Sequence, residues 1–389
     1  MMMKTLAVFT GTRAEFGLLR RLLERLNKSD IIVPLLAVTG SHLAQEYGYT
    51  VTEIENSGIP ISARLDILLF GQGELAIAKT IGYAIDIYST WLDEVKPDAV
   101  LLLGDRYEIF AAATAAAALS IPIAHISGGD VTLGAKDDYY RHCITKMASC
   151  HFPSCTEYAN RIIRMGEAPA TVHNVGGLGD ENIRTMPLLS KNAICDALSI
   201  SSDTRYALVT YHPETVGNKD IKAQMHELLS ALESSELFLI FSKANADAGG
   251  IEINAILEQY CKAHSNTRLY SSLGVLKYLS AMKYAQLVIG NSSSGVVETP
   301  SFGVPTVNIG TRQQGRIISD NIICCAPSQK DIEAAIFTAL SDEFIEKSAK
   351  TISPYNGGDT SKRIVSELER YITSQSLHEA KTFYDGEVT

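Results

Sequence analysis

The 389-residue sequence lacks several features that would place it in a specialised class of protein. It has no stretch of about 18 consecutive apolar residues, which argues against a membrane-spanning helix. The short apolar run at the amino terminus ends at Gly11, which fits a first strand better than a signal peptide. Its seven cysteines are an odd number and form no Cys-x-x-Cys pair, so neither a zinc ribbon nor a thioredoxin-type motif is indicated. We expect reduced thiols in a cytoplasmic protein.

Acidic residues outnumber basic residues, 44 to 34. The formal net charge of −10 argues against a broad nucleic-acid surface, although a phosphate group can still be bound by local donors. No His, Cys and Asp cluster has metal-ligand spacing, so we predict neither a tightly bound metal nor a cofactor. The end of the first predicted strand is not a Gly-x-Gly-x-x-Gly fingerprint or a P-loop, and the chain has no Gly-x-Ser-x-Gly elbow of the kind that carries a catalytic serine.

The composition that remains is that of a globular protein, with 46% apolar and 20% charged residues. The length exceeds what one hydrophobic core usually serves, so two domains are expected. Short apolar runs alternate with longer amphipathic segments, which is typical of parallel strands joined by helices. We therefore predict an α/β fold of two Rossmann-like domains with a central cleft, at residues 1–175 and 176–359. Residues 360–389, which begin with a helix, are expected to cross back onto the first domain.

The predicted elements follow from this alternation. Strands are predicted at residues 6–10, 33–39, 99–103, 123–126 and 151–152 in the first half, and at 206–210, 237–241, 287–289 and 306–308 in the second. Helices are predicted at 15–26, 219–233, 251–264, 275–285 and 360–371. In the first of them, leucines recur at intervals of three and four residues and form an apolar stripe along one face.

Small and hydroxyl-bearing residues follow the predicted strand at 287–289. Ser292 and Ser293 precede a helix expected to begin near Val296, where free N–H groups would attract a diphosphate. Glu298, in the first turn of that helix, could complement the helix dipole and accept hydrogen bonds from ribose hydroxyls. The alternative is an ordinary serine helix cap after a glycine turn.

Two arginines also follow predicted strands. Arg13 comes after the first strand, and Arg312 comes after the strand at 306–308. Either guanidinium could form a bidentate contact with phosphate, although Arg13 by itself could equally be a surface residue at a helix start. Parallel sheets bind ligands beyond the carboxyl ends of their strands, so these features together favour an anionic ligand.

Ionisable residues gather after the strands of the first half. Asp105 and Arg106 directly follow the strand at 99–103, and Asp130 follows the strand at 123–126. Crowded carboxylates have pKa values that are pushed apart, so one can act as an acid and another as a base, which suits proton transfer at carbon. A structural Asp–Arg pair at a strand end remains an alternative. The stretch 137–142 adds four more candidates: Asp137, Asp138, Arg141 and His142.

The second half contributes polar residues at the same kind of edge. His212 follows the strand at 206–210, and Asn245 and Asp247 follow the strand at 237–241. A single histidine is more often a hydrogen-bonded structural residue, so His212 is a candidate only in combination with its neighbours.

Seven motifs occur in an order that resembles the hydrolysing UDP-N-acetylglucosamine 2-epimerases of bacterial sialic-acid synthesis. They are Gly-Thr-Arg-Ala-Glu-Phe, Leu-Gly-Asp-Arg-Tyr-Glu, His-Ile-x-Gly-Gly-Asp, Asp-Asp-x-x-Arg-His-x-Ile-Thr-Lys, His-Pro-Glu-Thr, Gly-Asn-Ser-Ser-Ser-Gly-x-x-Glu and Gly-Thr-Arg-Gln-x-Gly-Arg. The resemblance implies a fold like that of the GT-B glycosyltransferases and a reaction that converts UDP-N-acetylglucosamine and water into N-acetylmannosamine and UDP. Anti elimination of UDP would give 2-acetamidoglucal, and water would then add back with inversion at C2.

The resemblance also implies roles for individual residues. Diphosphate contacts are implied for Arg13, Ser292, Ser293 and Arg312, other nucleotide contacts for His212 and Asn245, a ribose contact for Glu298, and proton transfer for Asp105 and Asp137. Some members of the family have a glutamate directly after His-Ile, where this chain has Ser127. We hypothesise that Asp105 and either Asp137 or Asp138 transfer protons, with Asp130 and His212 assisting. Further substrate contacts are expected at Arg106, Arg141, His142 and Asp247.

Other functions stay open at this point. A relative in legionaminic-acid synthesis acts on UDP-2,4-diacetamido-2,4,6-trideoxyglucose, and the residues that would select it cannot be recognised in the sequence. A GT-B glycosyltransferase would transfer the sugar to an acceptor, and a silent sensor would bind UDP without turnover. For partners we expect a UDP-sugar and a second copy of the chain, in a dimer or tetramer that could use the helix at 73–91, but neither nucleic acid nor a membrane.

Overall fold

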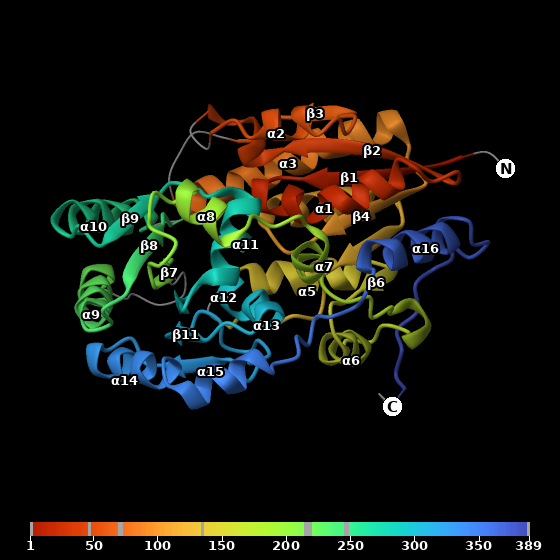
Figure 1. Ribbon diagram of the computed structural model, residues 1–389. Coiled ribbons are helices and arrows are strands. Elements are labelled where there is room, and N and C mark those ends of the chain that lie inside the picture. Colours follow the sequence, from red (N-terminus) through yellow and green to blue (C-terminus); the bar gives the residue numbers. More distant parts are fainter. Residues whose placement is uncertain are drawn as a thin grey trace. The chain divides into compact units, whose positions relative to one another are not determined.

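The structure is a computed structural model that describes residues 3–45, 48–68, 73–133, 136–213, 220–244 and 249–386. The chain divides into two compact units. The first consists of Met1–Asp130, Asp137–Asn182 and Gly357–Thr389, and the second of Val131–Lys136 and Ile183–Asn356. Each unit contains one six-stranded sheet with helices around it (Figure 1). The predicted α/β fold with two Rossmann-like sheets is therefore confirmed.

The first sheet has the strand order β3-β2-β1-β4-β5-β6, and all its neighbouring strands are parallel. Side chains along β1 alternate between two apolar clusters, with Leu6 and Val8 on one face and Ala7 and Phe9 on the other. Its strands are β1 (Lys4–Thr10), β2 (Ile32–Thr39), β3 (Ala63–Leu65), β4 (Ala99–Leu103), β5 (Ile123–Ile126) and β6 (Cys150–Phe152). The helices associated with this sheet are α1 (Arg13–Leu26), α2 (Val51–Asn56), α3 (Glu74–Val95), α4 (Tyr107–Ala118), α5 (Asp137–Met147), α6 (Thr156–Arg164), α7 (Leu178–Thr185) and α16 (Thr360–Ile372).

The second sheet repeats this design with the order β12-β11-β10-β7-β8-β9, again parallel throughout. Its strands are β7 (Tyr206–Thr210), β8 (Phe238–Ser242), β9 (Thr267–Tyr270), β10 (Leu287–Gly290), β11 (Thr306–Ile309) and β12 (Ile322–Cys325). The helices are α8 (Lys191–Ala197), α9 (Ile221–Glu233), α10 (Gly250–Ala263), α11 (Gly274–Tyr284), α12 (Ser294–Val297), α13 (Thr299–Phe302), α14 (Gln329–Ala339) and α15 (Asp342–Ala349).

Both sheets reverse their strand order at an equivalent place. In the first unit the chain moves outward from β1 to β3 and then returns to add β4 beside β1. In the second unit β10 is added beside β7 in the same way. Such a switch point leaves a crevice at the carboxyl ends of the two central strands, where open α/β sheets bind their ligands. The turns after β1, β4, β7 and β10 are therefore where functional residues are expected.

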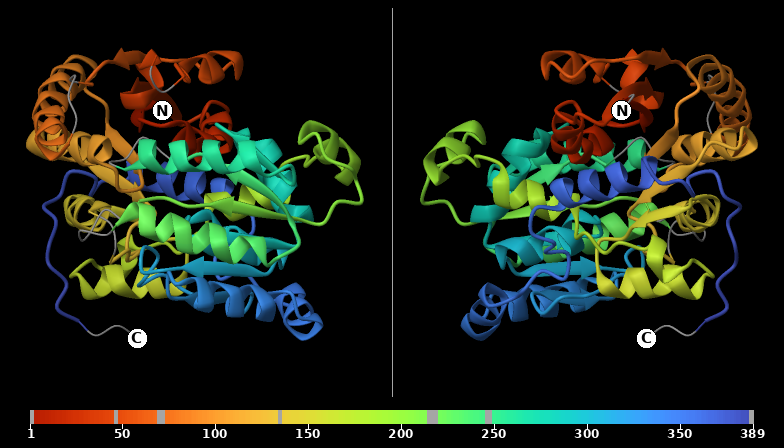
Figure 2. Two further views of the ribbon diagram at one scale, coloured as in Figure 1. Left: turned by 90° about the vertical axis from the view of Figure 1, so that its left-hand side faces the viewer. Right: turned by 90° about the vertical axis from the view of Figure 1, so that its right-hand side faces the viewer.

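The last helix belongs to the first unit. On α16, Ile364, Leu368 and Ile372 are buried in the same apolar cluster as Leu19 and Leu22 of α1. The helix, drawn in blue, lies beside the amino-terminal elements, and the segment after it continues as an extended trace (Figure 2). Among the helices of the described residues, none is long and apolar enough to cross a membrane.

Candidate functional site

The first turn at the switch point of the first unit is built around a capped helix. Thr12 is the N-cap of α1, and its hydroxyl accepts a hydrogen bond from the Glu15 N–H while the Glu15 carboxylate binds back to the turn. Glu15 Oε2 accepts from Gly11 N–H at 2.7 Å and from Thr12 N–H at 3.2 Å. Arg13 is the first residue of α1, and its Nε lies 2.9 Å from an oxygen of Glu53. These contacts fix the backbone of the predicted phosphate turn and give its arginine a carboxylate partner.

Arg141 lies at the centre of a cluster of carboxylates in the first unit. Its side chain is only 2% exposed, and it forms ion pairs with Asp105, which follows β4, and with Asp138 in the first turn of α5. Arg141 Nε is 2.8 Å from Asp105 Oδ2, and Nη1 is 2.8 Å from Asp138 Oδ1. The same Nη1 donates to the backbone carbonyl of Asp130 at 3.0 Å. One guanidinium thus connects three of the predicted acidic residues.

The charge of Arg141 is maintained by these neighbours. Burial alone would lower the pKa of Arg141, but the carboxylates of Asp105 and Asp130, with Asp138, raise it above the ordinary value. A buried charge of this kind is stable only while its partners remain, because an unpaired charge in the interior is strongly destabilising. The cluster is consequently preorganised: ion pairs hold the carboxylates of Asp105 and Asp138, and a hydrogen bond holds the backbone at Asp130.

Arg106, the residue after Asp105, forms a second ion pair in this region, with Glu108. Its Nε and Nη2 donate to the two carboxylate oxygens of Glu108 at 3.2 and 3.3 Å, a bidentate pair. The charge of Glu108 raises the pKa of Arg106 well above its ordinary value against the effect of burial, and Asp137 adds to the rise. Asp137 therefore lies in the field of Arg106, at the amino terminus of α5.

His142 extends the group on the same helix. Its Nε2 lies 3.5 Å from Asp138 Oδ2, and its Nδ1 is buried with no hydrogen-bond partner among the described residues. Burial lowers the pKa of His142, so the ring is neutral at pH 7. The structure thus brings together Asp105, Asp130, Asp138, Arg141 and His142.

In the second unit, Asn291 organises the turn after β10. Its Oδ1 accepts from the His212 N–H at 2.7 Å, and its Nδ2 donates to the His212 carbonyl at 2.8 Å. The Asn291 carbonyl in turn accepts from Arg312 Nη1 at 3.1 Å and from Gln313 Nε2 at 2.8 Å. This buried asparagine therefore connects the ends of β7, β10 and β11 and places His212 and Arg312 near each other.

The side chain of His212 is held in its neutral form. Burial lowers the pKa of His212 to about 3, and the charge of Arg312 contributes in the same direction. A neutral imidazole can donate or accept a hydrogen bond but brings no positive charge to an anion. Of the two residues, Arg312 is therefore the one suited to neutralise a phosphate.

The serine turn differs from its prediction in one respect. The helix begins at Ser294 rather than near Val296 and ends at Val297, and Glu298 then separates it from the equally short α13. Glu298 is thus at the junction of two single-turn helices, with Pro300 following, and not within the first turn of a long helix. The expected dipole is correspondingly weak, because it grows with the number of aligned peptides. Ser292 and Ser293 remain at the carboxyl end of β10.

Glu298 has a defined partner at this junction. The Ser294 hydroxyl donates to Glu298 Oε2. Burial raises the pKa of Glu298, and the bond from Ser294 only partly opposes this. Two other predicted residues, Asn245 and Asp247, lie outside the described residues. No cluster of three or more His, Cys, Asp or Glu side chains suited to a metal ion occurs in the described ranges.

Two residues that organise the turns were not predicted from the sequence. Asn291 lies inside the Gly-Asn-Ser motif, and only its contacts across three strands reveal its role. Glu15 had a recognisable signal, since Thr12 followed three residues later by glutamate is the pattern of a capping box.

Comparisons with known proteins add to this geometry. A family model described as UDP-N-acetylglucosamine 2-epimerase matches residues 24–369. A Campylobacter jejuni protein named GDP/UDP-N,N'-diacetylbacillosamine 2-epimerase (hydrolyzing) is 39% identical over 344 residues, 88% of each chain. An Escherichia coli protein named polysialic acid biosynthesis protein P7 is 36% identical over 385 residues, 98% of each chain. The structure of UDP-GlcNAc 2-epimerase from Neisseria meningitidis bound to UDP-GlcNAc is similar in fold, with a TM-score of 0.80 at 22% identity over 94% of this chain and 99% of that one.

Proposed function

The chain belongs to the UDP-N-acetylglucosamine 2-epimerase family, and from that premise we propose that it is a hydrolysing 2-epimerase of a UDP-linked 2-acetamido sugar. The observation that carries the proposal is the group of carboxylates fixed around Arg141 in a chain of this family. Removal of a proton from a sugar carbon needs a positioned base, and returning one to the opposite face needs a positioned acid. As substrate we propose UDP-N-acetylglucosamine, which would yield N-acetylmannosamine and UDP.

The chemistry assigned to the carboxylates is an elimination followed by a hydration. A carboxylate of the first unit takes the C2 proton, the C1–C2 double bond forms, and UDP leaves with the C1–O electron pair to give 2-acetamidoglucal. Water then adds its hydroxyl to C1, while C2 receives a proton on the face opposite to the one that lost it. Asp105 and either Asp137 or Asp138 are proposed for these proton steps, with Asp130 and His212 assisting.

The leaving diphosphate needs stabilisation of its negative charge. The turns after β10 and β11 offer suitable donors in Ser292, Ser293 and Arg312, and we assign diphosphate binding to them and to Arg13. Glu298, Asn245, Asp247, Arg106, Arg141 and His142 are the remaining proposed substrate contacts. Neutral His212 would then serve as a hydrogen-bond donor rather than as a counter-charge.

A second substrate is favoured by a specific observation. The Campylobacter jejuni relative, at 39% identity, is named for N,N'-diacetylbacillosamine, a 2,4-diacetamido-2,4,6-trideoxy sugar. The corresponding candidate for this chain is UDP-2,4-diacetamido-2,4,6-trideoxyglucose. The chemistry at C1 and C2 would be the same, so the two candidates differ only in the groups recognised at C4 and C6.

Both substrates are distinguished by one assay in heavy water. The purified protein is incubated with each UDP-sugar, UDP release is measured, and the free sugar is examined by NMR for deuterium at C2. We expect release of UDP, a product inverted at C2 and deuterium at that carbon, with the natural substrate giving the higher kcat/KM. Product that contains only protium at C2, or turnover that requires a sugar acceptor, would refute the elimination mechanism.

A comparison of two variants tests whether the activity depends on the cluster of carboxylates. Asp105→Asn keeps the size of the side chain but removes the carboxylate, and we expect kcat to fall by about 100-fold or more. Asp93→Asn, at an exposed position of α3, is the matched control and should retain wild-type turnover. Equal activity of the two variants would remove Asp105 from the mechanism.

A further inference from the structure

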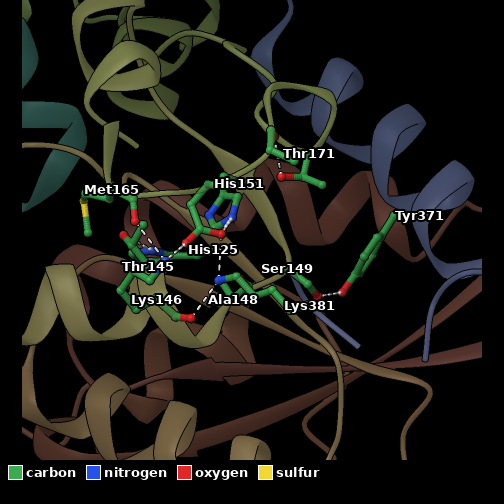
Figure 3. Close-up of polar contacts among 12 residues, drawn as sticks. His125, Thr145, Lys146, Ala148, Ser149, His151, Met165, Thr171, Tyr371 and Lys381 are labelled. Atoms are coloured by element: carbon green, nitrogen blue, oxygen red, sulfur yellow. Dashed lines mark hydrogen bonds and ion pairs between the residues drawn. The ribbon is translucent and has the colours of Figure 1, made fainter. Parts of the chain in front are cut away.

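His125 makes two hydrogen bonds to residues adjacent to the cluster of carboxylates around Arg141, one on the Asp105 turn and one on α5. It lies on β5 and is completely buried. Its Nε2 is 2.8 Å from the carbonyl oxygen of Gly104, the residue before Asp105. Its Nδ1 is 3.2 Å from the hydroxyl of Thr145, which is on α5 one turn after Arg141. Figure 3 shows His125 and Thr145 facing each other among the polar contacts of this region.

The chemistry of the two partners determines which nitrogen carries the proton. A carbonyl oxygen can only accept, so Nε2 must carry the hydrogen. In a neutral ring Nδ1 is then an acceptor, and the Thr145 hydroxyl donates to it. Burial lowers the pKa of His125 to about 4, and His151 and Arg141 act in the same direction while Asp105 opposes them. Both bonds are therefore made by an uncharged ring with one defined tautomer.

We propose that His125 is a positioning residue that holds the turn carrying Asp105 in register with the helix carrying Asp138 and Arg141. This inference rests on the proposed function, because it assigns the role through the proton-transfer group. Gly104 also donates its N–H to the Ile126 carbonyl at 3.0 Å, so both polar groups of its backbone are bound by β5. Since Arg141 and Thr145 share one face of α5, a ring that fixes Thr145 also fixes the helix at the Asp105–Arg141 ion pair.

The loop after β5 is shaped around this contact. A Cβ atom on Gly128 would lie 2.8 Å from the Thr145 hydroxyl and 3.0 Å from His125 Nδ1. No side chain fits there without displacing one of the two partners. The backbone that leads to Asp130 therefore closes directly over the His125–Thr145 hydrogen bond, so the same contact supports a third carboxylate.

His151 provides a matched control on the neighbouring strand. It is equally buried and pairs in register with His125. Its Nε2, however, lies 3.1 Å from Glu167, which is also bound by Lys146 and Lys381 at 2.6 Å each. Figure 3 shows these contacts running toward the carboxyl-terminal segment. A merely structural role of buried histidines would make the two positions equivalent, whereas the proposal does not.

The test compares kcat and KM for five variants of the full chain. His125→Phe should lower kcat by roughly 100-fold with KM changed by less than about threefold, because a small misplacement of the catalytic group affects the chemical step. Thr145→Val should lower kcat in the same direction, and Thr145→Ser should not. His125→Gln should restore part of the activity, since its amide can donate to Gly104. His151→Phe should leave kcat per folded molecule within about threefold of wild type.

The outcomes separate this inference from the proposed function. If wild-type protein releases no UDP from either sugar, the proposed function fails and this inference fails with it. If wild type is active but His125→Phe and Thr145→Val keep wild-type kcat, or lose no more than His151→Phe, only the positioning role is refuted. Should His125→Phe not fold, Thr145→Val decides alone. In addition, ¹⁵N NMR must show a neutral His125 with hydrogen on Nε2 between pH 5 and 8, and the other tautomer would overturn the proposal.

Discussion

Glu15 should make the stability of the first unit depend on pH in a direction that is unusual for a carboxylate. Its Oε2 accepts two backbone N–H groups, but Oε1 is buried without a hydrogen-bond partner among the described residues. Burial raises the pKa of Glu15 from 4.5 to about 8, and the charge of Glu108 adds to the rise, while Arg106 and the Gly11 N–H partly oppose it. We therefore expect the folded protein to retain a proton on Glu15 at pH 7.

The sign of the effect follows from proton binding. Between pH 4.5 and about 8 the unfolded chain has lost the Glu15 proton and the folded chain has kept it. The unfolded state then binds fewer protons, so the free energy of unfolding decreases as the pH rises through this window. Because each pKa unit corresponds to about 1.4 kcal/mol, the total loss is on the order of 5 kcal/mol. The contribution levels off once the folded group has also ionised.

Glu15→Gln isolates this contribution. The amide oxygen can accept from Gly11 and Thr12 as the carboxylate does, but the side chain cannot ionise. Trp91, the only tryptophan of the chain, is buried in the core of the first unit, so its fluorescence reports urea unfolding of that unit. We expect wild type and variant to have similar free energies of unfolding near pH 5 and the variant to be more stable at pH 8. Glu24→Gln, at an exposed position of α1, should follow the wild-type curve. Parallel curves for wild type and Glu15→Gln would show that Glu15 is ionised in the folded protein.

Three further substitutions test the contacts described above. Arg141→Lys loses the forked contact with Asp105 and Asp138, so kcat should fall by about 100-fold. The free energy of unfolding followed by Trp91 fluorescence should fall by roughly 2–4 kcal/mol, and unchanged stability would contradict the central role of the guanidinium. Lys381→Met leaves buried Glu167 without one of its two lysines and should cost about 1–3 kcal/mol by thermal unfolding while kcat stays at the wild-type value. Asn291→Leu removes both side-chain bonds to the His212 backbone, so the turn after β7 is no longer held to the turn after β10, whose backbone carbonyl binds Arg312. UDP binding should weaken by roughly tenfold in calorimetry, and unaltered affinity would exclude this role.

The sequence predicted the centres of both sheets better than their edges. The bounds predicted for β4, β5 and β7 are those observed, and these strands are buried along their whole length. Such strands are continuous apolar runs because both faces of a parallel sheet are covered. The missed strands β3, β9 and β12 are at sheet edges and contain half-exposed or exposed residues, including Arg64 and Arg268. In β3 and β9 an arginine interrupts the apolar run on which the prediction depended, whereas β12 is a short apolar run, Ile-Ile-Cys-Cys, that was not assigned as a strand.

The candidate site shows a similar division between local and distant information. The sequence singled out Asp105, Asp137, Asp138 and Arg141 because they are ionisable residues near strand ends. It could not show that Arg141 binds Asp105, 36 residues away, since that contact depends on the pairing of β4 with β5 and on the placement of α5 beside them. The roles of Asn291 and His125 depend on tertiary contacts in the same way.

The loop at Ser127 illustrates how such contacts decide where a carboxylate can act. Ser127 has a φ of 65°, in the left-handed region, and its N–H is bound to the Phe152 carbonyl at 3.0 Å. Gly128 is pressed against His125 and Thr145, and Gly129 has a φ of 79°. The first three residues of the loop therefore form its turn, and Asp130 is the residue that contacts Arg141. Arg141 donates a hydrogen bond to the Asp130 carbonyl, and the charge of Asp130 raises the pKa of Arg141. We therefore propose that Asp130 contributes to the acidic cluster around Arg141 the negative charge that Ser127 cannot supply.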